Sequence, residues 1–205
     1  MGRNYAMQGK NDQSKYQDAV VLFERCLALQ KLVHGENHSD TIQTVLSLVK
    51  IYEKQKNYEE AENILILSLL AQKSIHTEKQ LLESNPTTLQ TIFSLAKIYS
   101  LKKSYDKAEN LFLQCLYGRT LTLGVDHPDT CETLLNLCLS LFNLQRPDEA
   151  VMYLKQNLDS QSVSVARGTL VSISSLVTAY NQTGRSVEAN MLIDLMQQYT
   201  HHIDV

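Results

Sequence analysis

Four residues that lie close together in the chain carry side chains suited to chemistry: Asp126, His127, Asp129 and Thr130, within the stretch LGVDHPDT at 123–130. Two carboxylates beside an imidazole are typical of metal ligands and of general acid–base pairs. A true site needs these particular side chains, whereas a structural signal tolerates substitutes. The interpretation therefore depends on whether the stretch occurs once or returns elsewhere in altered form.

Related stretches recur along the chain, and they are HGENHSDT at 34–41, LLESNPTT at 81–88 and SVSVARGT at 162–169. A catalytic cluster would not be rewritten as SNPTT in a neighbouring copy, whereas a signal that starts a helix can be. Pro86 and Pro128 suit a first helical turn, with Asn85 and His127 near the N-cap. We therefore predict that these stretches are linkers that precede helices.

The cysteines and histidines are the remaining candidates for chemistry. No two of the four cysteines have CxxC spacing, so neither a zinc site nor a redox motif is predicted, and we expect Cys26, Cys115 and Cys138 to be small residues inside the packing. His38 and His127 occupy equivalent places in different copies, too far apart to share a metal ion. The sequence has no Gly-rich phosphate loop, no GxSxG and no HExxH motif. It predicts no catalytic residue, no metal site and no cofactor.

All of these residues belong to an internal repeat, whose helices would position them. One frame begins at Thr41, Thr88, Thr130 and Thr169, with spacings of 47, 42 and 39 residues between successive threonines. We give each residue a repeat position, which is the number of residues by which it follows its threonine. Position 20 is alanine in every copy, namely at Ala61, Ala108, Ala150 and Ala189. Four matches in one frame indicate a real repeat.

Each copy predicts two helices. Val45, Leu48, Val49 and Tyr52 recur at i, i+3, i+4 and i+7, which marks one face of a first helix, and the short polar connector at 55–57 precedes a second. Alanine at position 20 allows two antiparallel helices to approach where they cross. Glycine (7) and proline (3) are scarce, which argues against a strand-rich fold. We predict an all-α fold of antiparallel helix pairs.

The repeat resembles the tetratricopeptide repeat (TPR). Tyrosine at position 11 and alanine at position 20 match that family's pattern, and apolar residues stand at position 24, namely Leu65, Phe112, Leu154 and Ile193. The copies are longer than the usual 34 residues and are similar to the kinesin light chain variety. The resemblance implies a right-handed α-solenoid, a TPR-like superhelix in which the first helices line a concave groove.

We predict one TPR-like solenoid over residues 1–205, with a partial repeat at 1–38 and repeats at 39–85, 86–127, 128–166 and 167–205. Residues 5–10 are expected to be the tail of a first helix, and residues 16–34 a second helix. Neither end carries a polar capping helix, so we expect a fragment of a longer solenoid or ends that another chain covers. Self-association through the uncapped ends is a further expectation, with Leu192 and Leu195 at the C-terminal one.

The resemblance implies that partner contacts come from the side of each first helix that does not pack on the second helix. The predicted partner-binding residues are Gln43, Ser47, Lys50, Lys54, Gln90, Phe93, Ser94, Lys97, Leu135, Asn136, Leu139, Phe142 and Asn143. Lys50 and Lys97 share position 9 and would form a short basic column, while Phe93 and Phe142 would contribute to an apolar floor. Such a groove suits an acidic and apolar peptide. In the alternative, the lysines are merely solvated and Phe93 packs between repeats.

Composition narrows the function further. The net charge is −3, with 11 basic and 11 acidic residues in 1–100 and 8 and 11 in 101–205, so neither half has the basic surface of a nucleic-acid binder. No apolar run suits membrane insertion and no signal peptide begins the chain, so we expect a cytoplasmic protein. We predict a non-enzymatic adaptor or scaffold that binds a protein or peptide. The alternative is a regulatory or sensor array cut from a larger protein that contains an enzyme or a nucleotide switch.

Overall fold

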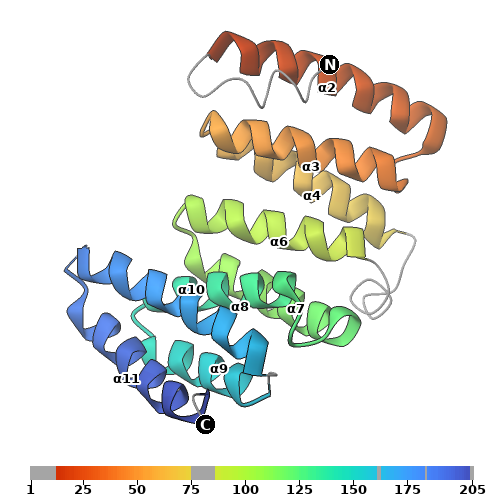
Figure 1. Ribbon diagram of the computed structural model, residues 1–205. Coiled ribbons are helices and arrows are strands. Elements are labelled where there is room, and N and C mark those ends of the chain that lie inside the picture. The colour runs from red at the N-terminus through yellow and green to blue at the C-terminus, as the bar shows by residue number, and fades with distance from the viewer. Residues whose placement is uncertain (1–12, 75–85, 161–162, 183, 204–205) are drawn as a thin grey trace. The chain divides into compact units, whose positions relative to one another are not determined.

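The computed structural model describes residues 13–74, 86–160, 163–182 and 184–203, and all regular structure in these ranges is helical (Figure 1). The helices are α2 (Gln13–His34), α3 (Ser39–Lys54), α4 (Tyr58–Lys73), α6 (Pro86–Leu101), α7 (Tyr105–Leu123), α8 (Pro128–Asn143), α9 (Pro147–Ser160), α10 (Val163–Gln182) and α11 (Ser186–Ile203). The predicted all-α class of helix pairs is confirmed. The predicted tail of a first helix at 5–10 lies outside the described residues.

The chain divides into two compact units, residues 1–104 and 105–205. The boundary falls inside the predicted repeat 86–127, with α6 in the first unit and α7 in the second. The other repeat boundaries remain predictions.

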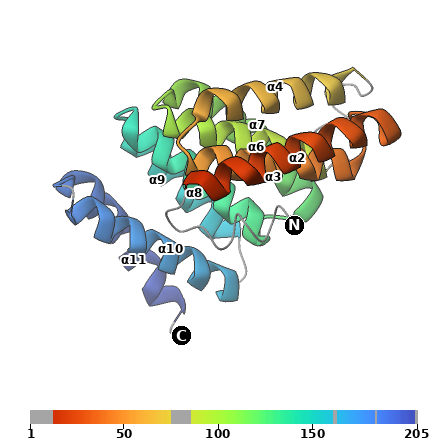
Figure 2. The same cartoon turned by 90° about the horizontal axis from the view of Figure 1, so that it is seen from above.

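In the first unit α3 packs against α2, α4 and α6, and α4 also packs against α6 (Figures 1 and 2). The side chains of Leu48, Leu65 and Ile98 are completely or almost completely buried between these helices. They come from the apolar faces that the 3.6-residue spacing predicts, because each helix turns one stripe toward its neighbours.

In the second unit α8 packs against α7, α9 and α10, while α11 packs against α10 and α9. Phe112, Leu137, Leu154 and Ile173 fill its core. Leu192 and Leu195 are buried in this core as well. The expectation that these two leucines form an exposed C-terminal apolar end is therefore wrong, because α11 turns them toward the helices on which it packs.

Alanine at position 20 lies at helix crossings, as predicted. Ala61, Ala108, Ala150 and Ala189 are all fully buried. The close approach is seen directly between α8 and α9, where the Cys138 thiol donates a hydrogen bond to the Ala150 carbonyl at 3.5 Å. A larger side chain at such a crossing would force the two backbones apart.

The small-residue interpretation of the cysteines is only partly right. Cys115 and Cys138 are buried, as expected, but Cys26 is exposed on α2. Cys115 and the equivalent residue of α4, Ser68, both stand at position 27 and are covered. The same face of α2 also exposes Leu22 and Leu29. Cys26 is exposed because no described helix packs on this face of α2.

Every complete first helix ends in the same way. A residue in the left-handed region occupies position 15 of each copy, and these residues are Lys56 (φ 58°), Lys103 (φ 60°), Gln145 (φ 59°) and Gly184 (φ 76°). The next backbone N–H then donates to the carbonyl of position 11, as from Ser104 to Tyr99 at 2.9 Å. This bond is the 6→1 bond of a Schellman motif, which satisfies an otherwise unpaired carbonyl and fixes the turn into the second helix.

The stretch LGVDHPDT is the start of a helix. The Nδ1 of His127 accepts a hydrogen bond from the Asp129 backbone N–H at 3.2 Å, and Pro128 opens α8. His38 caps α3 in the same way, with a bond of 3.3 Å from the Asp40 N–H. The predicted N-cap role of His127 is thereby confirmed, while Asn85 lies outside the described residues.

The fourth linker does not form as predicted. Within SVSVARGT at 162–169, the residues from Val163 onward belong to α10. This stretch has no proline, aspartate or asparagine that would delay the helix start, so α10 begins about one turn before the repeat frame predicts.

Buried polar contacts join α4 to α6 and α7 to α8, and both come from the same repeat position. At position 31 of its copy, Gln72 accepts a hydrogen bond from Thr88 at 2.5 Å, and its amide lies 3.5 Å from Thr91. Position 31 of the next copy is Arg119, which is only 2 % exposed. Its guanidinium donates to the Asp129 carbonyl at 2.7 Å and to the Thr133 hydroxyl at 2.8 Å.

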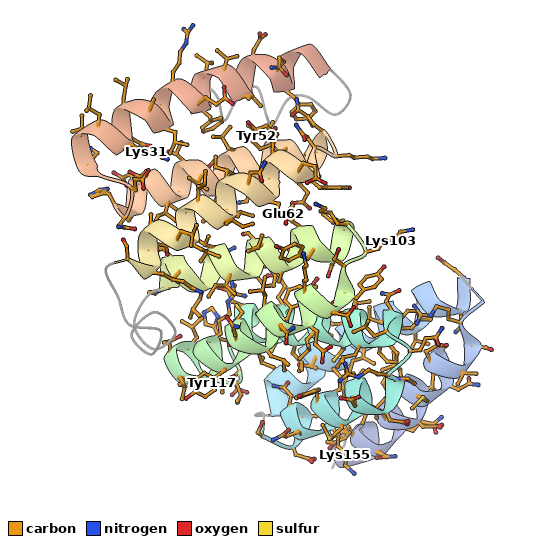
Figure 3. The ribbon with its side chains drawn as sticks, turned by 180° about the vertical axis from the view of Figure 1, so that it is seen from behind. Lys31, Tyr52, Glu62, Lys103, Tyr117 and Lys155 are labelled. Carbon is orange, nitrogen blue, oxygen red and sulfur yellow. The ribbon has the colours of Figure 1, made fainter. Side chains whose placement is uncertain are left out.

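A tyrosine hydrogen bond and ion pairs join neighbouring helices of the first unit, and Figure 3 labels two of the residues involved, Tyr52 and Glu62. The Tyr52 hydroxyl donates to Glu24 at 3.0 Å, and burial together with this bond raises the pKa of Tyr52. Lys102, which directly follows α6, lies 2.5 Å from Glu62 and 2.8 Å from Glu59, both on α4. These contacts hold successive helices in register and leave other faces of the same helices open to solvent.

Candidate partner-binding faces

The predicted contact residues of α3 lie together along one exposed side of the helix. Gln43, Lys50 and Lys54 are exposed and Ser47 is half-buried, whereas the apolar residues between them are buried. The Ser47 hydroxyl donates to the Gln43 carbonyl at 2.8 Å, which leaves its oxygen as an acceptor toward solvent. This side of α3 therefore presents two ammonium groups and a line of polar atoms.

On α6, Gln90, Ser94 and Lys97 are half-buried. The Ser94 hydroxyl donates to the Gln90 carbonyl at 2.8 Å, as in the equivalent bond on α3. Lys97 lies 3.7 Å from the Glu53 carboxylate of α3, so part of its charge is balanced within the fold. The predicted basic column is consequently uneven, with Lys50 more exposed than Lys97.

The corresponding side of α8 is less charged. Leu135, Asn136 and Leu139 are half-buried and Asn143 is exposed. The Asn136 amide donates to the Glu132 carbonyl at 2.8 Å, and the Asn143 amide donates to the Leu139 carbonyl at 2.7 Å. Because the amide nitrogens act as donors, the side-chain oxygens remain available as acceptors. The Asn143 side-chain oxygen already accepts one hydrogen bond, from Arg185 at 3.2 Å.

The two predicted phenylalanines are core residues, so the expectation that they contribute to an apolar floor is wrong. Phe93 is 3 % exposed and Phe142 is 0 % exposed. The Phe142 ring meets Tyr180 edge to face, with centroids 5.2 Å apart, and the Phe142 carbonyl accepts a hydrogen bond from Arg185 at 2.5 Å. Both rings lie on the sides of their helices that meet a neighbouring helix, so neither offers area to a partner.

A pocket of about 420 Å³ lies in the second unit, between the start of α8 and the first half of α10. Its lining residues are Asp126, Pro128, Cys131, Glu132, Leu135, Thr169 and Ser172. Of these only Leu135 is among the predicted contact residues. Thr169 and Ser172 of α10 lie inside the predicted repeat 167–205 but were not predicted as contact residues. Asp126 and Pro128 were interpreted only as part of a linker and a helix start.

Within the described ranges, no group of three or more His, Cys, Asp or Glu residues converges as a metal site would. Burial raises the pKa of the Cys115 thiol to about 11 and raises that of Cys138 as well, so neither thiol is poised as a nucleophile. Within the same ranges, no helix is both long and apolar enough to span a bilayer.

Comparisons with known proteins agree with this architecture. The family model described as tetratricopeptide repeat matches residues 2–73 and 87–161, and a model described as PPR repeat matches residues 171–200. No curated protein matches the chain significantly.

Solved structures share the fold. The nearly identical TPR-like repeats of kinesin light chain type from Podosopora anserina have a TM-score of 0.72 at 22 % identity, covering 96 % of this chain and 90 % of that one. Their Q17M variant gives 0.73 with the same identity and coverage. BtubC (BKLC) from P. vanneervenii gives 0.56 at 12 % identity, covering 99 % of this chain and 88 % of that one. The repeat frame, the helix pairs and a family model that matches most of the chain establish that this protein belongs to the tetratricopeptide repeat family, with a fold like that of kinesin light chain repeats.

Proposed function

We propose that this protein is a non-catalytic adaptor or scaffold that binds a partner peptide on the exposed sides of its first helices. TPR proteins generally mediate protein–protein interaction, which supports the general class. The observation that supports this location most is the exposed side of α3. Gln43, Ser47, Lys50 and Lys54 follow one another there at helical spacing, whereas the apolar residues of α3 are buried.

The charge of this side indicates the partner. Lys50 and Lys54 are exposed, and neither has an ion-pair partner within 4 Å among the described residues. An acidic segment would meet these ammonium groups, while the oxygens of Ser47 and Gln43 would accept backbone N–H groups. A single exposed ion pair is worth about 0–1 kcal/mol, so most affinity must come from apolar contacts elsewhere on the peptide.

Selection from a displayed library of random dodecapeptides tests this proposal. The wild-type chain should enrich peptides that contain Asp and Glu, and the Lys50→Glu/Lys54→Glu variant should lose that enrichment. Lys73→Glu/Lys155→Glu changes the charge equally on other exposed sites and should keep it. Circular dichroism confirms that each variant is folded. If the wild-type chain enriches no peptide family, or if both double variants select the same peptides as wild type, the proposal fails.

Self-association is a second candidate, because α2 exposes an apolar face. Leu29, Leu32 and Val33 are 64 %, 83 % and 70 % exposed. Contiguous apolar surface of this kind is typical of a protein interface. Sedimentation velocity over a concentration series should show dimers that Leu29→Gln/Leu32→Gln abolishes and Leu67→Gln, an exposed leucine of α4, does not. A chain that stays monomeric at every concentration would exclude this candidate.

No feature of the described residues favours the regulatory or sensor array of a larger enzyme. The cytoplasmic location stays a prediction.

A further inference from the structure

The pocket of the second unit differs in charge from the exposed side of α3. Its walls are mainly apolar, formed by Pro128, Cys131 and Leu135 together with carbon atoms of the α10 residues. Among the described residues that line it, two are charged, Asp126 and Glu132, and both are acidic. The nearby Arg119 does not line the pocket, since its guanidinium is buried against the Asp129 carbonyl and the Thr133 hydroxyl.

This combination suits one kind of side chain. Lysine and arginine bury their methylene stems along apolar surface while the charged head remains at a polar rim. The volume of about 420 Å³ is within the range of pockets that bind small ligands, so a long side chain fits together with part of its backbone. A glutamate or aspartate of a partner would instead meet carboxylates of its own sign.

We infer that this pocket accepts a lysine or arginine side chain of the partner peptide, with the stem on Leu135 and Pro128 and the head toward Glu132 and Asp126. The inference rests on the proposed peptide-binding function and makes it more specific. The partner peptide then carries a basic residue for the pocket. Charge complementarity of this kind fixes the register of a peptide more than it adds affinity.

The dodecapeptide selection tests this inference with different variants. Peptides selected by the wild-type chain should be enriched in Lys and Arg, and Glu132→Lys should reverse that preference toward acidic residues. Asp194→Lys makes the same change on an exposed part of α11 in the same unit and should leave the selection unchanged. For one selected synthetic peptide, Glu132→Gln should weaken binding about two- to fivefold, the range of a partly exposed ion pair.

Cys131 reports occupancy of the pocket directly, because it is half-buried in the lining while Cys26 is exposed in the other unit. The rate of alkylation by N-ethylmaleimide, followed by peptide mass spectrometry, should fall about tenfold at Cys131 when the selected peptide is present at ten times its Kd. The rate at Cys26 should not change. A peptide with its basic residue replaced by glutamate should give little protection at the same concentration.

The outcomes separate the two proposals. If peptides are selected but Lys and Arg are not enriched, or if the peptide with glutamate in place of its basic residue protects Cys131 equally well, the basic-residue pocket is wrong while peptide binding stands. If Glu132→Lys leaves the selected sequences unchanged, the pocket inference is likewise wrong. The pocket inference holds if the selected peptides are enriched in Lys and Arg, if Glu132→Lys removes that enrichment, and if the selected peptide protects Cys131. It then holds even where Lys50→Glu/Lys54→Glu has no effect and the proposed role of α3 fails.

Discussion

Replacement of Phe142 by alanine tests whether this residue belongs to the core or to a binding surface. Its side chain is 0 % exposed and its ring packs edge to face on Tyr180, with centroids 5.2 Å apart. Removing a fully buried phenylalanine costs about 3–5 kcal/mol, including about 0.5–1.5 kcal/mol for the aromatic pair. In a chain of this length each kcal/mol corresponds to about 2–4 °C, so the melting temperature should fall by about 6–20 °C.

Leu139→Ala is the matched comparison, because it lies on the same helix and was predicted to contact the partner as well. Its half-buried side chain predicts a cost of about 1 kcal/mol, since only part of a leucine is removed from the core. Urea unfolding followed by circular dichroism and by tyrosine fluorescence measures both variants, and coincident transitions test two-state behaviour. A loss below about 1 kcal/mol for Phe142→Ala, or equal losses for both variants, would refute the assignment of Phe142 to the core.

Three further predictions concern the helix ends and a buried phenol. His127→Ala should cost about 1 kcal/mol in urea unfolding, because it removes the acceptor for the Asp129 N–H, whereas His127→Asn should restore most of the loss. Lys103→Gly should stabilise the chain by about 1 kcal/mol and Gly184→Ala should destabilise it similarly, because both positions have positive φ. A lower melting temperature for Lys103→Gly together with a higher one for Gly184→Ala would contradict the left-handed conformation of these positions. Burial raises the pKa of Tyr180 to about 12, against 10.0 for an ordinary tyrosine. Between about pH 10 and 12 the phenol therefore ionises in the unfolded chain but not in the folded one, and the free energy of unfolding should fall as pH rises through this window. Tyr180→Phe should have a flatter pH profile in that window, and an unchanged slope would exclude this contribution.

The sequence by itself determined the helices and most of their buried faces. The fixed positions of threonine, tyrosine and alanine place two helices in each copy, and a helix of period 3.6 turns the same positions inward each time. The N-cap of α8 and the crossing alanines follow from local geometry, so Ala108 and His127 could be assigned without any knowledge of distant residues. The exposure of Gln43, Lys50 and Lys54 follows from the same periodicity, as the reverse side of the buried stripe.

Tertiary structure decided which of the remaining residues are accessible. Phe93 and Phe142 occupy the flank of a first helix, and whether a flank meets solvent or another helix depends on how neighbouring helix pairs pack, which no local pattern encodes. Cys26 repeats the sequence position of Cys115 but not its environment, because burial requires a second helix on that face. The pocket forms because α10 packs on α8 and brings Thr169 and Ser172 beside it. Hydrophobic periodicity describes the faces of one helix, whereas this pocket and the burial of these side chains depend on how two or more helices pack together.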